Sequence, residues 1–151
     1  MLMSAEEVRQ FEDEGFIFVP DLFNVEELAV LKGEIPAIFA ERRPEIVREK
    51  SGDVVRTAFA THTYNDVYRR FVSHPRILEP ARQLLGGDVY IHQFKLNGKV
   101  AFDGDIWQWH QDYGTWQRDD DMPEARAMNL AVFLDEVNEF NGPLYVVPKS
   151  H

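Results

Sequence analysis

The segment from Trp109 to Asp112 places an imidazole and a carboxylate two residues apart, at His110 and Asp112, within a run rich in β-forming residues. In a β-strand, alternate residues point to the same face, so both side chains can reach one metal ion. A histidine and a carboxylate are two of the three protein ligands in the 2-His-1-carboxylate site of non-haem Fe(II) oxygenases. The alternative is a surface histidine and aspartate that lie close together without a metal.

Two neighbouring strands are expected to carry rows of polar side chains. Within and just after a strand over residues 89–96, Gln93 and Asn97 share one face. A second strand over residues 106–113 carries His110 on its polar face. Either these rows face water, as on a half-exposed sheet, or they converge on a polar cavity of the kind that binds small molecules.

The first half of the chain has the signals of helices. Ser4 begins a capping-box pattern that opens a helix over residues 5–14, which Gly15 can terminate. Asn24 opens a second helix, which Pro36 should kink or interrupt. The remaining segments of this half are a β-prone run at 16–19, a polar loop at 42–53, and helices at 65–72 and 75–85.

After Gly87 the pattern changes from helical to β. The expected strands span residues 89–96, 106–113, 128–134 and 144–147. We therefore expect an α+β fold in a single domain over residues 1–151, with a helical part at 1–87 and strands at 88–151.

Composition restricts the partners and the kinds of metal site. The 16 basic and 26 acidic residues give a formal charge of −10, which disfavours nucleic acid and anionic membranes as partners. The chain contains no cysteine, so nitrogen and oxygen ligands must hold any metal. No basic, apolar leader opens the sequence, and no apolar run approaches the about 18 residues of a membrane span. We expect a soluble, cytoplasmic protein.

Several blocks of the second half, taken in order, resemble the phytanoyl-CoA dioxygenase superfamily. The blocks are Val89-Tyr90-Ile91-His92-Gln93, Trp109-His110-Gln111-Asp112-Tyr113-Gly114-Thr115-Trp116, Asp121-Met122-Pro123, Phe140-Asn141-Gly142-Pro143-Leu144 and Pro148-Lys149-Ser150-His151. The stretch from Gly15 to Phe23 also resembles the opening of that family. Within the superfamily, the blocks are similar to those of ectoine hydroxylases and of hydroxylases that act on free amino acids.

The resemblance implies an Fe(II)- and 2-oxoglutarate-dependent dioxygenase built on a double-stranded β-helix, a jelly-roll core like that of the cupins. Such an enzyme uses O2 to hydroxylate an unactivated C–H bond. The substrate implied here is a free amino acid or a similar small zwitterionic metabolite.

The resemblance also assigns roles to individual residues. His110 and Asp112 match the first two iron ligands of the family. Lys99 matches a position that contacts 2-oxoglutarate, and Asn97 lies on the same polar row. The residues that match substrate-binding positions of ectoine hydroxylases are Gln93 and Trp116.

Three positions depart from the family pattern. Ectoine hydroxylases carry arginine where this chain has Lys95 and a small hydroxyl residue where it has Ala131, and both changes weaken the case for ectoine as substrate. Lys149 replaces the usual glycine of the motif before His151, so the local turn is expected to differ.

In this family the third iron ligand, a histidine, and the arginine that pairs with 2-oxoglutarate follow the motif that ends at His151. His151 itself does not match the ligand position. We therefore expect the chain to be the N-terminal half of a longer enzyme, inactive by itself. The alternatives are an ectoine hydroxylase proper, a non-catalytic β-sandwich binding module and an inactive fragment.

Overall fold

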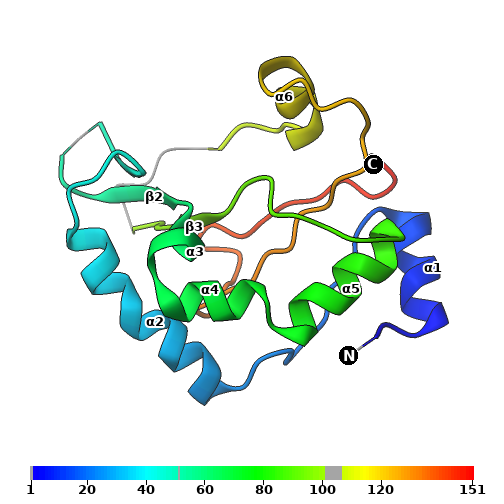
Figure 1. The fold of residues 1–151 in the computed structure, drawn as a ribbon, viewed down its shortest axis with the longest axis horizontal. Coiled ribbons are helices and arrows are strands. Elements are labelled where there is room, and N and C mark those ends of the chain that lie inside the picture. The colour runs from blue at the N-terminus through cyan, green and yellow to red at the C-terminus, as the bar shows by residue number, and fades with distance from the viewer. Residues whose placement is uncertain (1, 51, 101–106) are drawn as a thin grey trace.

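The computed structural model describes residues 2–50, 52–100 and 107–151 as an α+β arrangement of helices around a small antiparallel sheet (Figure 1). The elements are α1 (Ala5–Glu14), α2 (Val25–Ala40), β1 (Ile46–Arg48), β2 (Val55–Phe59), α3 (Thr61–Tyr64), α4 (Asp66–Val72), α5 (Pro75–Leu85), β3 (Lys95–Asn97) and α6 (Asp112–Asp119). The strand order is β1-β2-β3, and both pairings are antiparallel.

The expected starts of α1 and α2 are confirmed, as is the stop of α1 at Gly15. The Ser4 hydroxyl accepts the backbone N–H of Glu7 at the start of α1, while the Glu7 carboxylate accepts the N–H of Ser4. Asn24 and Glu27 make the same reciprocal pair at the start of α2. Each pair satisfies backbone donors that lack a partner within the helix, which is why such short local patterns predict helix starts well.

Pro36 does not interrupt α2, contrary to one of the two outcomes expected from the sequence. A proline removes one backbone donor and crowds the preceding turn, which costs about 3 kcal/mol in a helix interior. Leu31 and Ile38 flank the proline and are only 4% and 2% exposed. Burial of the residues on both sides of the proline against the core offsets this cost in free energy. Tertiary packing therefore determines the length of the helix.

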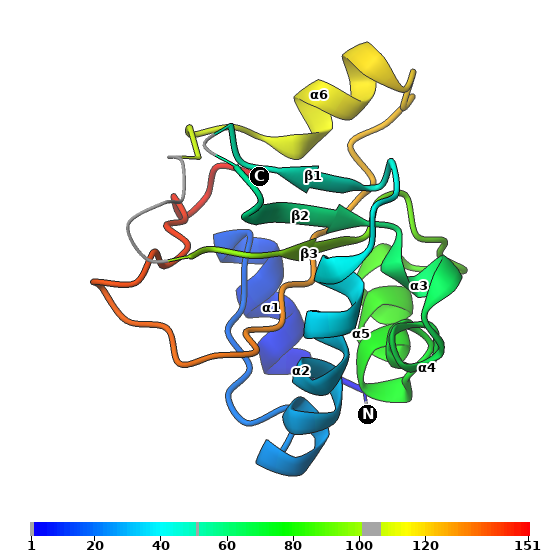
Figure 2. The same cartoon turned by 90° about the vertical axis from the view of Figure 1, so that its left-hand side faces the viewer.

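The hydrophobic core lies between the sheet and the helices α2 and α4. Its buried members are Leu31, Ile38, Ile46, Val55, Ala58, Tyr68 and Leu96. The Tyr68 hydroxyl donates to the Leu31 carbonyl at 3.0 Å, and burial raises the pKa of Tyr68 to about 12. Figure 2 shows α2, α4 and α5 grouped beyond the β3 side of the sheet, with α6 beyond the β1 side.

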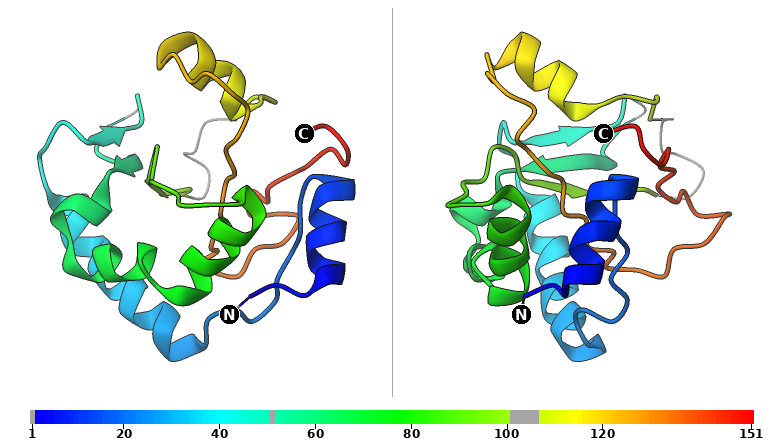
Figure 3. Two further views of the ribbon diagram at one scale, coloured as in Figure 1. Left: turned by 45° about the vertical axis from the view of Figure 1, so that its right-hand side comes forward. Right: turned by 90° about the vertical axis from the view of Figure 1, so that its right-hand side faces the viewer.

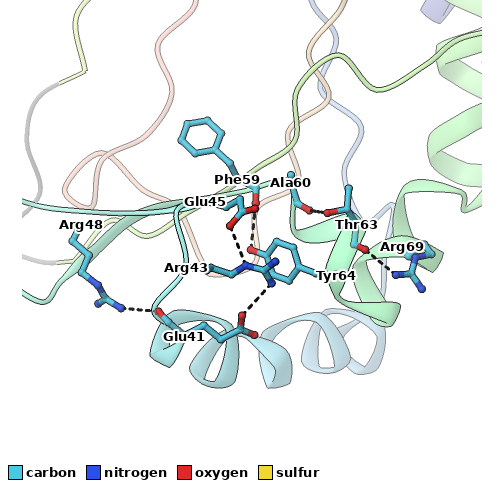
Figure 4. Close-up of polar contacts among 9 residues, drawn as sticks. All are labelled: Glu41, Arg43, Glu45, Arg48, Phe59, Ala60, Thr63, Tyr64 and Arg69. Carbon is cyan, nitrogen blue, oxygen red and sulfur yellow. Dashed lines mark hydrogen bonds and ion pairs between the residues drawn. The ribbon is translucent and has the colours of Figure 1, made fainter.

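A cluster of polar contacts fixes the connection between α2 and β1 against α3 (Figure 4). The guanidinium of Arg43 lies 3.6 Å from the ring centroid of Tyr64, and its nitrogens pair with Glu41 and Glu45 at 3.1 and 3.0 Å. The Tyr64 hydroxyl donates to the carbonyl of Phe59 at 3.2 Å. The contact between cation and ring therefore ties the α2–β1 connection to α3, and the Tyr64 hydroxyl ties α3 to the end of β2.

The helices α1 to α5 lie within the expected helical part, but the strands β1 and β2 lie there too. Residues 42–53, expected as a loop, contain β1, which forms a hairpin with β2. Of the expected strand at 89–96, only its end belongs to β3, and the run at 16–19 is not a strand. Residue 106 lies outside the described residues. Residues 107–111, 128–134 and 144–147 are irregular, so the double-stranded β-helix expected over 88–151 is not seen in the described residues.

The segment 128–151 crosses the molecule as irregular backbone and returns to α1 (Figures 1 and 3). Leu134 packs against the core, and Asp135 pairs with Lys32 of α2 at 2.6 Å. Further along, the backbone N–H of Lys149 donates to the Glu14 carbonyl at 2.8 Å. A β-strand requires a neighbouring strand for its backbone hydrogen bonds. The segment 128–151 is held instead by side-chain contacts and by the hydrogen bond near its end.

Candidate metal centre

His110 and Asp112 lie next to each other at the start of α6. Asp112 is the first residue of that helix, and His110 belongs to the irregular segment that leads into it. The Nε2 atom of His110 is 3.2 Å from Oδ1 of Asp112. The strand expected here is absent among the described residues, and the turn into the helix brings the two side chains together instead.

Each member of the pair has its outer polar atom engaged by the protein. Nδ1 of His110 donates to the carbonyl of Gln108 at 2.6 Å, which leaves Nε2 as the atom directed at Asp112. The side-chain amide of Asn129 donates to Oδ2 of Asp112 at 2.8 Å, which leaves Oδ1 directed at His110. Contacts of this kind orient the ligands of protein metal sites.

The donor set and its spacing fit a divalent metal ion. With metal–ligand bonds of about 2.1 Å, two neighbouring donors of an octahedral ion lie about 3 Å apart. The observed separation of 3.2 Å between Nε2 and Oδ1 is close to that value. A proton on Nε2 would occupy the same space, so a metal ion and a proton compete for this position. Within residues 2–50, 52–100 and 107–151, no group of three or more His, Cys, Asp or Glu residues could hold a metal.

Three of the other histidines, His74, His92 and His151, are engaged away from this pair. Nδ1 of His74 accepts the N–H of Arg76 at the start of α5, and Nε2 of His151 donates to the carbonyl of Glu12. His92 hydrogen-bonds to Asp120, at the opposite end of α6 from Asp112. Among the described residues, none of these three joins His110 and Asp112 in a group that could hold a metal.

Asn97 and Lys99 lie at the end of β3 and just beyond it. Asn97 is exposed, and its side-chain oxygen accepts the hydroxyl of Thr57 across the β2–β3 pairing at 2.9 Å. The exposed side chain of Lys99 runs across the backbone of Gly142, so closely that a Cβ at Gly142 would overlap its stem. Leu96, just before Asn97, is only 7% exposed and lies in the core, so β3 alternates as expected.

Gln93 and Trp116 differ in their surroundings. Gln93 is exposed in the irregular segment before β3. Trp116 lies on α6, one turn after Asp112, and is only 7% exposed. Its ring meets that of His92 edge-on, with 5.0 Å between the centroids and an interplanar angle of 67°. Tyr90, two residues before His92, is 79% exposed.

Sequence reasoning missed Asn129, which orients Asp112. The signal available was a lone amide within the apolar run 128–134, at a position expected to be part of a strand. It also missed the pairing of His92 with Asp120. Neither partner stands in a recognisable spacing to the other, so only the folded chain shows the contact.

The family model for phytanoyl-CoA dioxygenase (PhyH) matches residues 11–151. The chain belongs to this family. Among curated members, the ectoine dioxygenase of Bordetella parapertussis (strain 12822 / ATCC BAA-587 / NCTC 13253) is 41% identical over 155 residues, which cover 99% of this chain and 50% of that protein. The L-proline trans-4-hydroxylase of Streptomyces griseoviridis is 40% identical over 137 residues, covering 91% of this chain and 51% of that protein. The chain thus spans about half the length of the curated family members it matches.

Solved structures of the family share the arrangement described above. The crystal structure of EctD from S. alaskensis with 2-oxoglutarate and 5-hydroxyectoine superposes with a TM-score of 0.78 at 34% identity, over 82% of this chain and 45% of that one. The structure of EctD from S. alaskensis with bound Fe gives a TM-score of 0.71 at 34% identity, over 76% of this chain and 42% of that one. At this identity, the match supports a common fold across the covered residues.

In the described residues, no helix is both long and apolar enough to cross a lipid bilayer.

Proposed function

We propose that this chain contributes part of the active site of an Fe(II)- and 2-oxoglutarate-dependent hydroxylase. The substrate is a free amino acid or a similar small zwitterion, and O2 is the oxidant. The observation that carries the proposal is the His110–Asp112 pair, in which Nε2 and Oδ1 face each other at 3.2 Å in a chain of this family. The whole of residues 1–151 belongs, in this proposal, to one oxygenase domain.

His110 and Asp112 would hold the iron, with Gln108 and Asn129 fixing the direction of each ligand. The bound iron would supply the redox chemistry that couples conversion of 2-oxoglutarate to succinate and CO2 with hydroxylation of the substrate. In this proposal the third protein ligand and a cationic partner for 2-oxoglutarate lie outside residues 1–151, which span about half the length of the curated relatives.

Lys99 and Asn97 are assigned to 2-oxoglutarate. An ammonium group attracts a dicarboxylate, and a side-chain amide can donate a hydrogen bond to one of its oxygens. Asn97 keeps its amide nitrogen available, because its oxygen accepts the Thr57 hydroxyl. Gln93 and Trp116 are assigned to the substrate, for which an amide and an indole offer a polar contact and an apolar wall.

The substrate class follows from the charge of the chain and from the names of the matching proteins. An ectoine dioxygenase and an L-proline hydroxylase both match at about 40% identity. A formal charge of −10 disfavours a polyanionic carrier such as coenzyme A. Lys95 stands where ectoine hydroxylases carry arginine, so we place a free amino acid before ectoine.

The test uses the protein expressed from its complete coding sequence, called the whole protein below. It is incubated with Fe(II), ascorbate and 2-oxoglutarate in the presence of free amino acids, L-proline, ectoine or an acyl-CoA. We expect succinate formation that depends on a free amino acid and yields a hydroxylated product. Turnover of the acyl-CoA alone would refute the substrate class, and turnover of ectoine alone would make the protein an ectoine hydroxylase.

A matched variant tests the metal assignment. Asp112→Asn keeps the size of the side chain and its place beside Asn129 but removes the negative charge. We expect it to lower succinate formation at least about 100-fold, because a carboxylate ligand is lost. Unchanged iron binding and turnover in this variant would remove Asp112 from the site. A whole protein that binds small molecules but forms no succinate would be a non-catalytic binding module.

A further inference from the structure

His92, which has no role in the proposed chemistry, makes two contacts with the end of α6. Its ring packs edge-on against the indole of Trp116, with the centroids 5.0 Å apart. Its Nε2 atom lies 3.0 Å from Oδ2 of Asp120. The three side chains therefore form one connected group that joins the segment before β3 to α6.

The same group is closed by backbone contacts. The N–H of Asp120 donates to the carbonyl of Trp116 at 3.0 Å, and the N–H of Met122 donates to the same carbonyl at 3.1 Å. Asp120 is thus held close to Trp116 by the end of the helix, and its carboxylate fixes the plane of the imidazole. A ring fixed in this way leaves a 7% exposed indole little freedom to turn.

We propose that His92 is a positioning residue that sets the orientation of Trp116 toward the substrate. This inference rests on the proposed function, in which Trp116 contacts the substrate. The two ends of α6 are then fixed separately. Asn129 holds Asp112 at the start of the helix, and His92 holds Trp116 near its end.

Because different residues fix the two ends of α6, substitutions at the two ends should have different consequences. Loss of the ring contact at His92 should loosen the substrate and leave the metal ligands in place. Loss of Asn129 should weaken iron binding first. A residue that merely stabilised the fold would change both properties together, along with the resistance of the protein to unfolding.

The experiment compares His92→Ala, His92→Phe and Asp120→Asn in the whole protein, with the amino-acid substrate found in the assay above. For each variant we would measure substrate KM, kcat, the ratio of succinate to hydroxylated product, and the Kd for Fe(II). We expect His92→Ala to raise KM between about threefold and tenfold, the range that an aromatic contact supports. The ratio of succinate to product should also rise, and the Kd for Fe(II) should stay within about twofold of wild type.

His92→Phe keeps a ring against Trp116 and should recover most of the loss in KM. Asp120→Asn, which keeps a polar partner without the charge, should lie between wild type and His92→Ala. If the wild type is active and His92→Ala has the same KM and the same ratio of succinate to product, this inference alone is overturned. Parallel losses of KM, iron affinity and stability would also overturn it, because they describe a structural residue. A wild type that forms no succinate would overturn the proposed function and this inference with it.

Discussion

His151 packs its imidazole directly against the Cα of Gly15, at the C-terminal end of α1. The Nε2 atom of His151 donates to the carbonyl of Glu12 at 3.0 Å, so a distant side chain satisfies one of the free carbonyls of the helix. Gly15 has a φ of +82°, in the left-handed region. The contact therefore depends on a residue without a Cβ.

We predict that Gly15→Ala destabilises the whole protein by at least about 1–2 kcal/mol in urea unfolding. The new Cβ disfavours the left-handed conformation and overlaps the His151 ring. The matched control is Gly33→Ala within α2, where nothing lies within 4 Å of the added atom. That control should stabilise by about 0.5–1 kcal/mol. Equal effects of the two changes would show that His151 does not pack on Gly15.

Lys149 has a φ of +62°, a conformation that glycine adopts with least strain. We predict that Lys149→Gly raises the free energy of unfolding by about 0.5–1 kcal/mol, because the strain is removed and the exposed pair with Glu14 contributes little. Lys149→Ala removes the same ion pair and keeps the strain, so it should leave stability unchanged or slightly lower. A Lys149→Gly variant no more stable than Lys149→Ala would contradict the prediction.

Asn129 should control metal affinity through Asp112. We predict that Asn129→Ala raises the Kd for Fe(II) of the whole protein between about 10-fold and 100-fold, because the carboxylate loses the contact that directs Oδ1 toward His110. Titration with Fe(II) under anaerobic conditions measures the effect. Gln117→Ala, at an exposed position on the same helix, serves as the control and should bind iron as wild type does.

His62 should make stability depend on pH. Burial, with a smaller contribution from the charge of Arg69, lowers the pKa of His62 below its ordinary value of 6.5. Its Nδ1 atom is buried without a hydrogen-bond partner among the described residues, and its ring packs against Phe94. Below pH 6.5 the unfolded chain therefore takes up a proton that the folded chain resists, so the free energy of unfolding falls as the pH falls.

His62→Phe keeps a ring against Phe94 and removes the titrating group. We predict that this variant loses less stability than wild type between pH 7.5 and pH 5, measured by urea unfolding at each pH. Above the ordinary pKa of histidine, the imidazole and the phenyl ring are both neutral, so protonation no longer contributes to the difference in stability between the two proteins. Parallel stability curves for the two proteins over this range would exclude His62 as the source.

The helices could be predicted from the sequence because their signals are local. Ser4 and Asn24 each bond within a few residues, and these contacts do not depend on the rest of the fold. The hairpin of β1 and β2 was missed because its first strand is short and lies in a polar stretch. The strand expected at Trp109 is replaced in the described residues by irregular backbone that leads into α6 at Asp112.

At the metal pair, the spacing of His110 and Asp112 was informative although the expected element was wrong. On a strand, residues two positions apart have their side chains on the same face. Here the turn into α6 brings the two side chains together instead. An aspartate in the first turn also favours a helix start through the helix dipole, a signal that the β-like aromatic residues around it outweighed. The contacts of Asn129 and His92 join separate segments, so no local pattern announces them.

The hydrogen bond between His151 and Glu12 joins residues 139 positions apart. Closing a loop of that length costs entropy that only later contacts can offset, and contacts of such high separation slow folding. On the ribosome, α1 emerges early, and the side chain that covers its end emerges long afterwards. The contact that covers the end of α1 therefore waits for residue 151, whereas Met3, just before α1, already pairs with Gln83 of α5. Gln111, the residue between the metal pair, bonds to the Ser150 carbonyl, so this contact also joins parts of the chain that emerge at different times.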